Sequence, residues 1–327
     1  MRREAFLRGA GQLVTASLLW DGAALRAAGA EDLPPLRLGL AEGDDATPTL
    51  YALKAGLFKK YNVDVQLTKM PSGAAGLAAL AGGSLDVAGT SLLPFFSAYS
   101  RGLPLQLVAP LAVYSPESVY AVILVKKDAP YKSGRDLDGK TIASSALKDL
   151  NWLASMTWID ANGGDSSKVR AIEMPASAIP AGLDSGLIDA ATVTTPRYVQ
   201  AVTAGRVRIL GKSYEAIAKH FTFAAMAARS EFADKNRALI ERFGRAIRDA
   251  SLYTNAHHSD TLPIYAAFAH IDPKDIENAP RAVSPPYLEA KDIAPLIDAA
   301  VRYKVLDRTM DPQRLISSAA LKPGTEA

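Results

Sequence analysis

The chain has 327 residues, of which 49% are hydrophobic, and it contains no cysteine. A chain of this length can bury one or two hydrophobic cores, and without cysteine it has no disulfide, thiolate metal site or thiol nucleophile. The 37 basic and 34 acidic residues give a formal net charge of +3. The sequence shows no basic stripe of the kind that binds nucleic acid, so we expect no nucleic-acid partner.

The first 30 residues have the pattern of a cleaved export signal. Arg2, Arg3 and Arg8 form a positively charged start. Residues 13–20 form an apolar stretch that is too short to span a bilayer, and residues 28–30 are a small-residue cleavage motif. The paired arginines resemble a twin-arginine signal, and the general secretory route is the alternative. Removing this segment takes away four arginines and two acidic residues, so the sequence predicts a nearly neutral, periplasmic mature protein.

Short apolar strands then alternate with helices, which is the pattern of a parallel α/β sheet. Thr47-Pro48 provides an N-cap and a first-turn proline for a helix, and Gly82-Gly83 ends a later one. We predict strands at 36–41, 63–67, 85–88 and 105–109, with helices after Pro48, after Ser72 and over 91–101.

A second series of the same kind follows an apolar run at 119–125. Because it mirrors the first series, we expect two similar lobes rather than one large sheet. An extended apolar run at 221–228 is predicted to return the chain to the first lobe, and the sequence from residue 234 onward has helical periodicity. In the second series we predict strands at 141–144, 169–174, 189–193 and 206–210, and helices over 147–162 and 177–186.

Four short motifs, in this order and spacing, resemble those of a known protein family. They are GLFKKYNVDV at 56–65, GSLDVA at 83–88, DLDGKTIA at 136–143 and GLIDAA at 186–191. Together they resemble the nitrate/sulfonate/taurine group of periplasmic solute-binding proteins, which includes pyrimidine-precursor binders. The similarity extends from about residue 36 to about residue 316.

The resemblance implies an α/β, two-lobed periplasmic-binding-protein fold of type II, in which each lobe is a mainly parallel sheet flanked by helices and two crossovers join the lobes. We expect lobe 1 over 31–124 and 225–327, lobe 2 over 125–224, and the crossings near 123–126 and 221–224. The resemblance also implies a monomer, without a cofactor, that passes a small-molecule ligand to a membrane permease and its ATPase in an ABC transporter.

Small polar residues stand at two helix starts in the first lobe, each after a predicted strand. Parallel strands end at one edge of a sheet, where open α/β sheets bind ligands, and free N–H groups at a helix start suit an anion. The alternative is that these residues only begin and cap the helices. The residues predicted to bind ligand here are Ser72, Gly73, Ala74, Thr90 and Ser91.

The loop after the first predicted strand carries Glu42, Asp44 and Asp45 and leads to Thr47. The resemblance implies that this loop contacts the ligand, through Asp44, Asp45 and Thr47. Acidic residues disfavour an anion, because like charges that lie close together repel strongly when they are desolvated. Either the acids point to solvent or they bind an amine or ring N–H, and the sequence leaves both open.

Polar residues also follow two predicted strands of the second lobe. Arg197 could hold an anion through two hydrogen bonds, and a solvated arginine is the alternative. Aromatic residues near the crossings are candidate apolar walls, with core packing favoured for Trp152. The further predicted ligand-binding residues are Tyr114, Ser144, Ser145, Lys148, Thr194, Thr195, Arg197 and Phe223.

The predicted function is to bind a small organic or inorganic anion, such as a sulfonate, taurine or nitrate, for import. The alternative ligand is a neutral or cationic nitrogen heterocycle, such as a pyrimidine precursor. An enzyme of the desulfinase or pyrimidine-synthase type is disfavoured, because those resemblances imply an essential cysteine and the chain has none. The four histidines lack the spacing of a metal site, so we expect neither catalysis nor a bound metal.

Overall fold

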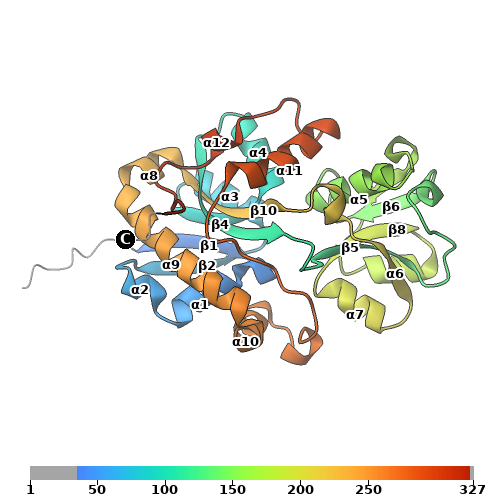
Figure 1. Ribbon diagram of the computed structural model, residues 1–327, viewed down its shortest axis with the longest axis horizontal. Helices are drawn as coiled ribbons and strands as arrows, with labels where there is room; N and C mark the ends of the chain where they lie inside the picture. Colours follow the sequence, from blue (N-terminus) through green and yellow to red (C-terminus); the bar gives the residue numbers. More distant parts are fainter. Residues whose placement is uncertain (1–34, 325–327) are drawn as a thin grey trace, which may run out of the picture. The chain divides into compact units, whose positions relative to one another are not determined.

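The computed structural model describes residues 35–324, which contain two five-stranded sheets flanked by helices (Figure 1). The predicted signal peptide lies outside the described residues. The first sheet contains β1 (Leu36–Ala41), β2 (Val65–Met70), β3 (Val87–Ser91), β4 (Leu105–Tyr114) and β10 (Phe221–Arg229). The second contains β5 (Ala121–Lys126), β6 (Thr141–Ser144), β7 (Arg170–Glu173), β8 (Ala190–Thr194) and β9 (Val207–Gly211).

Each sheet is mainly parallel, with one antiparallel strand in an inner position. The strand orders are β2-β1-β3-β10-β4 and β7-β6-β8-β5-β9. β10 runs antiparallel between β3 and β4, and β5 has the same place between β8 and β9. The predicted fold class, two mainly parallel sheets flanked by helices, is confirmed.

Two short segments, residues 115–120 and 212–220, connect the sheets. β5 therefore lies wholly in the second sheet and β10 wholly in the first. The crossings expected near 123–126 and 221–224 fall inside these strands, a few residues later than the observed connections. A continuous apolar run predicts a buried strand, but it does not indicate at which residue the chain leaves one sheet for another.

Helices pack on the sheets because the strands are buried on both faces; all but the last residue of β10 are buried. Outside the segment from β5 to β9, the helices are α1 (Thr47–Lys54), α2 (Leu57–Lys60), α3 (Gly73–Ala81), α4 (Leu92–Ser100), α8 (Ser230–Lys235), α9 (Arg237–Ala256), α10 (His258–Ala269), α11 (Ala290–Arg302) and α12 (Pro312–Leu315). Within that segment they are α5 (Leu150–Ala161), α6 (Ile179–Ser185) and α7 (Arg197–Thr203). Among the helices of residues 35–324, none is long and apolar enough to cross a membrane.

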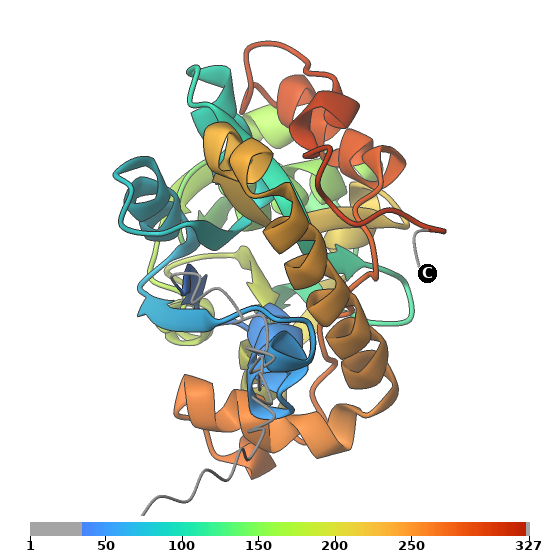
Figure 2. The same ribbon diagram turned by 90° about the vertical axis from the view of Figure 1, so that its left-hand side faces the viewer.

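The long helix that runs diagonally across Figure 2 is α9. It packs against α1 and α2, and its buried face includes Ile240, Phe243 and Ile247, which are spaced as one side of a helix. The ring of Phe243 stacks on that of Phe58 in α2, with centroids 5.4 Å apart. This packing fixes the helices that follow β1 against the C-terminal part of the chain.

The carboxyl ends of β1 and β3 lie at the same edge of the first sheet, since Leu38 of β1 pairs in parallel with Val87 of β3. The start of α3 lies against the end of β3. A Cβ atom on Gly73 would lie 2.9 Å from Thr90 Oγ1 and 3.0 Å from Thr90 Cα. Only glycine permits this close approach, which brings the first turn of α3 to the sheet edge.

Candidate functional site

A cavity of about 90 Å³ lies at the edge where β1 and β3 end. Three short segments supply its polar lining: the loop after β1, the start of α3 and the start of α4. The structure therefore brings together three stretches that the sequence predicted to meet at one sheet edge. The residues concerned are Glu42, Gly43, Asp45, Gly73, Thr90 and Ser91.

Two helices begin at this cavity. Ser72 caps α3, and its Oγ accepts a hydrogen bond from the Ala75 N–H at 3.1 Å, while Ser91 stands at the cap of α4 without a side-chain bond to the helix. The N–H groups of Gly73 and Ala74 belong to the first turn of α3 and have no acceptor within the helix. Helix N-termini of this kind carry partial positive charge and bind anions.

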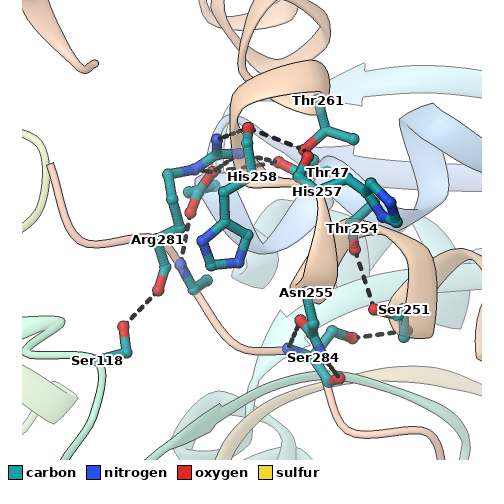
Figure 3. A network of polar contacts seen from close by, with 12 residues as sticks. Thr47, Ser118, Ser251, Thr254, Asn255, His257, His258, Thr261, Arg281 and Ser284 are labelled. Atoms are coloured by element: carbon teal, nitrogen blue, oxygen red, sulfur yellow. Dashed lines mark hydrogen bonds and ion pairs between the residues drawn. The ribbon is translucent and has the colours of Figure 1, made fainter. Parts of the chain in front are cut away.

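Asp44 does not line the cavity but belongs to a buried polar network, of which Figure 3 labels Thr47 and Arg281. Its side chain is 3% exposed and forms an ion pair with Arg281 at 2.6 Å. It also accepts hydrogen bonds from Thr47 Oγ1 at 3.1 Å and from the Ala282 N–H, and Arg281 Nη2 donates to Thr47 Oγ1 at 3.1 Å. Ligand contact was predicted for both Asp44 and Thr47, but here their side-chain oxygens hold the loop after β1 in place. Thr47 is also the first residue of α1 and not its N-cap, which is Ala46.

The network extends to α10 and to one of the connections between the sheets. Arg281 Nη1 donates to the His258 carbonyl at 3.2 Å, and Ser118 Oγ donates to the Arg281 carbonyl, as Figure 3 shows. Burial and the nearby Arg281 charge lower the pKa of His258, with Asp44 opposing them, so this imidazole is neutral at pH 7. Within residues 35–324, no group of three or more His, Asp or Glu could hold a metal ion.

A larger cavity, of about 710 Å³, lies beside this network. Its lining includes Glu117, Ser118, His258, Glu277 and Arg281, and none of the residues predicted to bind ligand. The guanidinium of Arg281 already donates to Asp44, Thr47 and His258. The most basic group at this cavity is therefore occupied by the protein itself.

Asp45 has a different environment from its neighbour Asp44. It is half-buried and lines the small cavity. Burial, reinforced by the negative charge of Asp44, raises the pKa of Asp45 to about 6. Among the residues that the structure describes, no lysine, arginine or histidine forms an ion pair with it.

Aromatic side chains from both connections between the sheets lie near Asp45. Tyr120 stacks on Phe223 with ring centroids 5.1 Å apart, and Tyr214 lies 6.3 Å from Tyr120 and 5.7 Å from Phe223. Burial raises the pKa values of Tyr120 and Tyr214 well above the usual range, and the charge of Asp45 adds to the shift in both. The charge of Asp45 therefore acts on two of the three packed rings, and we call Tyr120, Tyr214 and Phe223 the aromatic wall.

Tyr114 supports the aromatic wall from behind. It is fully buried, and its ring centroid lies 6.0 Å from that of Tyr214 and 5.8 Å from that of Phe221. Burial, with the charges of Glu215 and Glu117, raises the pKa of Tyr114 to about 12. Its predicted role in ligand contact thus becomes a packing role.

The strand ends of the second sheet contribute a further carboxylate, that of Asp149. Ser144 Oγ and Ser145 Oγ donate to it at 2.7 and 2.6 Å, and it caps α5 by accepting the Trp152 N–H at 2.7 Å. The charge of Asp149 also raises the pKa of Tyr214. Ser144 and Ser145 therefore lie near the aromatic wall, with their hydroxyl protons directed to Asp149.

The remaining predicted residues of the second sheet divide into two groups. Thr194 pairs with Ala121, and the Thr195 N–H donates to the Tyr120 carbonyl at 3.0 Å, so the end of β8 lies beside the aromatic wall. Arg197 is exposed at the start of α7. Lys148 Nζ donates to the Lys304 carbonyl at 2.9 Å, beyond the end of α11. Neither positive charge is placed at the small cavity.

Sequence reasoning missed Tyr120, Tyr214 and Arg281. Tyr120 stands at the start of the apolar run predicted at 119–125, so an aromatic residue at the edge of a predicted crossing was the available signal. Arg281 pairs with a residue 237 positions away, and no local pattern indicates such a contact.

The model of the NMT1-like family matches residues 29–267. The chain belongs to the NMT1-like family. A curated aliphatic sulfonates-binding protein of Escherichia coli (strain K12) is 26% identical over 202 residues, which is 62% of this chain and 61% of the relative. The match thus spans less than two thirds of that relative's length.

Solved structures resemble this NMT1-like chain over most of its length. The periplasmic aliphatic sulphonate binding protein SsuA from Escherichia coli has a TM-score of 0.72 at 20% identity, covering 90% of this chain and 95% of SsuA. The periplasmic nitrate-binding protein NrtA from Synechocystis PCC 6803 has a TM-score of 0.71 at 17% identity, covering 88% of this chain and 87% of NrtA. The periplasmic-binding-protein fold that the sequence predicted is thereby confirmed.

Proposed function

We propose that the chain is the extracytoplasmic substrate-binding component of an ABC importer, which binds a small sulfonate-, taurine- or nitrate-like anion and delivers it to the permease. The observation that carries the proposal is the small cavity where α3 and α4 begin, at the ends of β1 and β3. Gly73 begins α3 and Ser91 caps α4 at this cavity, and helix starts carry free N–H groups that suit a small anionic group. The relatives that bind sulfonate or nitrate support the same proposal.

We propose that the ligand binds in the small cavity and not in the larger one beside His258. Open α/β sheets bind ligands outside the carboxyl ends of their strands, which is where the small cavity lies. At the larger cavity the guanidinium of Arg281 is held by Asp44, Thr47 and a carbonyl. The other cation of its lining, Lys274, shares that lining with two acids, Glu117 and Glu277.

We infer that the two sheets belong to two lobes that close on the ligand. The lobes keep the order of the sequence-based proposal, 31–124 with 225–327 and 125–224, but with β5 in the second sheet and β10 in the first we set their limits at the connections of 115–120 and 212–220. The connections at 115–120 and 212–220 would then act as hinges. Tyr120 and Tyr214 lie on these connections. A ligand that contacts either ring would therefore favour the closed arrangement of the lobes.

The remaining parts of the proposal concern location and chemistry. A signal peptide over residues 1–30 would direct the protein to the periplasm, where it works as a monomer with a membrane permease and its ATPase. We propose binding without catalysis, since the chain has no cysteine to act as a thiol nucleophile.

Thermal-shift measurements on the mature protein test this function. Sulfonates, nitrate, carboxylates, taurine and pyrimidines are added one at a time. Ligand at about 100 times its Kd stabilises a protein by roughly 2.7 kcal/mol, so a true ligand should raise Tm by several degrees. The absence of a shift with every compound would contradict the proposed ligand classes.

A matched pair of variants locates the binding site. Ala74 and Ala78 are both exposed on α3, one turn apart. Ala74→Asp places a negative charge at the helix start, where it should reduce the affinity for an anion tenfold or more, by roughly 1.4 kcal/mol, while remaining compatible with the helix dipole. Ala78→Asp adds the same charge farther along the helix and should leave affinity within about twofold. Equal effects of the two variants in calorimetry would count against an anion site at the start of α3.

A second candidate ligand, a nitrogen heterocycle such as a pyrimidine precursor, is favoured by one observation. Asp45 lines the same cavity as the two helix starts and has no cationic partner among the described residues. A ligand with only negative charge would leave this carboxylate uncompensated.

A further inference from the structure

The three acidic residues of the loop after β1 differ in what neutralises them. Glu42 forms an ion pair with Lys69 at 2.9 Å, and Asp44 forms its buried ion pair with Arg281 at 2.6 Å. Asp45 forms none with any residue of 35–324. Asp45 is therefore the only one of these three acids whose charge is not balanced by an ion pair within the described residues.

The local backbone keeps the Asp45 carboxylate at the cavity. A Cβ atom on Gly43 would lie 2.3 Å from Asp45 Oδ1, so the carboxylate rests against the Gly43 backbone in a space that any other residue would fill. Gly43 and Asp45 line the cavity together with Gly73, Thr90 and Ser91. An acceptor and two sets of N–H donors therefore share one small volume.

The charge of the Asp45 carboxylate also acts on aromatic residues that do not line the cavity. The aromatic wall lies within the reach of its charge, as does Tyr265 of α10. Tyr120 is half-buried, and its ring stacks on that of Phe223. A carboxylate beside aromatic rings is the environment that binds cationic or N–H-bearing nitrogen, through a charge-assisted hydrogen bond and cation–π attraction.

We propose that Asp45 binds a nitrogen-bound proton of the ligand, and that the ligand therefore carries both an N–H donor and an anionic group. The anionic group binds the starts of α3 and α4, and the ammonium or amino group binds Asp45 beside the aromatic wall. This inference rests on the proposed binding function and specifies its ligand class. An amino sulfonate and an amino-substituted heterocyclic acid both have this chemistry.

Calorimetry with two matched pairs of probes tests the inference. Taurine and ethanesulfonate differ only in the amine, and 4-aminopyrimidine-5-carboxylate and pyrimidine-5-carboxylate differ only in the amino group. We expect the wild-type protein to bind the amine-bearing member of one pair at least about tenfold more tightly. The pair that shows the preference identifies the aliphatic or the heterocyclic source. Equal affinity within both pairs, including none detectable, overturns the inference.

Two variants assign the preference to Asp45. Asp45→Asn keeps the size of the side chain but removes its charge, and it should abolish the preference for the amine. Asp64→Asn removes one negative charge from an exposed position outside the cavity lining and should keep the preference. A preference that survives in Asp45→Asn overturns the inference. The Ala74 and Ala78 variants report separately on the anion site, so this result leaves the proposed function standing.

Discussion

Asp44 and Asp45 are neighbours in the sequence, yet the fold uses them in opposite ways. Asp44 is 3% exposed, and its carboxylate is held by Arg281, Thr47 and a backbone N–H. Asp45 is half-buried at a cavity and forms no ion pair with any cation of residues 35–324. One carboxylate stabilises the loop, and we propose that the other binds a ligand. The difference shows that residue type in a loop does not reveal function until the partner of each charge is known.

The largest effect on stability should come from breaking the Asp44 ion pair. Arg281→Met leaves a buried carboxylate without its cation, and loss of one partner of such a pair destabilises a protein by about 3–5 kcal/mol. Urea unfolding measures the loss. Asp44→Asn combined with Arg281→Met should recover part of it, because the double variant leaves no unpaired charge. A loss below about 1 kcal/mol would mean that Asp44 does not depend on this ion pair.

A smaller effect of opposite sign is expected at Asp45. Its pKa in the folded protein is about 6, above the ordinary 3.8, so the native state holds this proton more tightly and loses stability as the pH rises from about 4 to 6. Asp45→Asn should therefore stabilise the ligand-free protein at pH 7.5 by about 1–2 kcal/mol, a figure reduced for partial exposure.

The effect of Asp45→Asn on stability at low pH serves as the control for this prediction. At pH 4 the Asp45 side chain is protonated in the folded protein, so Asp45→Asn should change Tm little. The charged and titratable groups around it are Asp44 with Arg281, Glu42 with Lys69, and the phenols of Tyr120, Tyr214 and Tyr265. The phenols have raised pKa values and stay neutral in this range. A destabilisation by Asp45→Asn at pH 7.5 would show that the carboxylate has a favourable partner in the folded chain.

The smallest effect should belong to Glu42, the third acid of the loop. Its ion pair with Lys69 is exposed, with 42% of the Glu42 side chain and 38% of that of Lys69 accessible, and such pairs contribute about 0–1 kcal/mol. Glu42→Gln should change the free energy of unfolding by about 0.5 kcal/mol or less. A loss as large as that of Arg281→Met would remove the distinction between the buried and exposed acids of this loop.

Local patterns predicted the part of the site that depends on local structure. Ser72-Gly73 and Thr90-Ser91 follow strand signals at helix starts, and the alternation of strands and helices is enough to place them at one edge. Contacts between residues far apart in the sequence could not be predicted. Arg281 contacts Asp44 across 237 positions, so the sequence did not indicate that Asp44 is paired inside the protein whereas Asp45 lines the cavity. The crossings were placed a few residues late for a similar reason, because apolar periodicity continues through a connection without marking it.

The most direct test of the binding site is a crystal structure of the mature protein with the tightest-binding compound from the matched pairs. We predict an acidic group of the ligand within about 3.2 Å of the N–H groups at the start of α3, and a ligand nitrogen within about 3.2 Å of an Asp45 carboxylate oxygen. Ligand density in the larger cavity beside His258 and Glu277, with the small cavity filled only by water, would contradict both assignments.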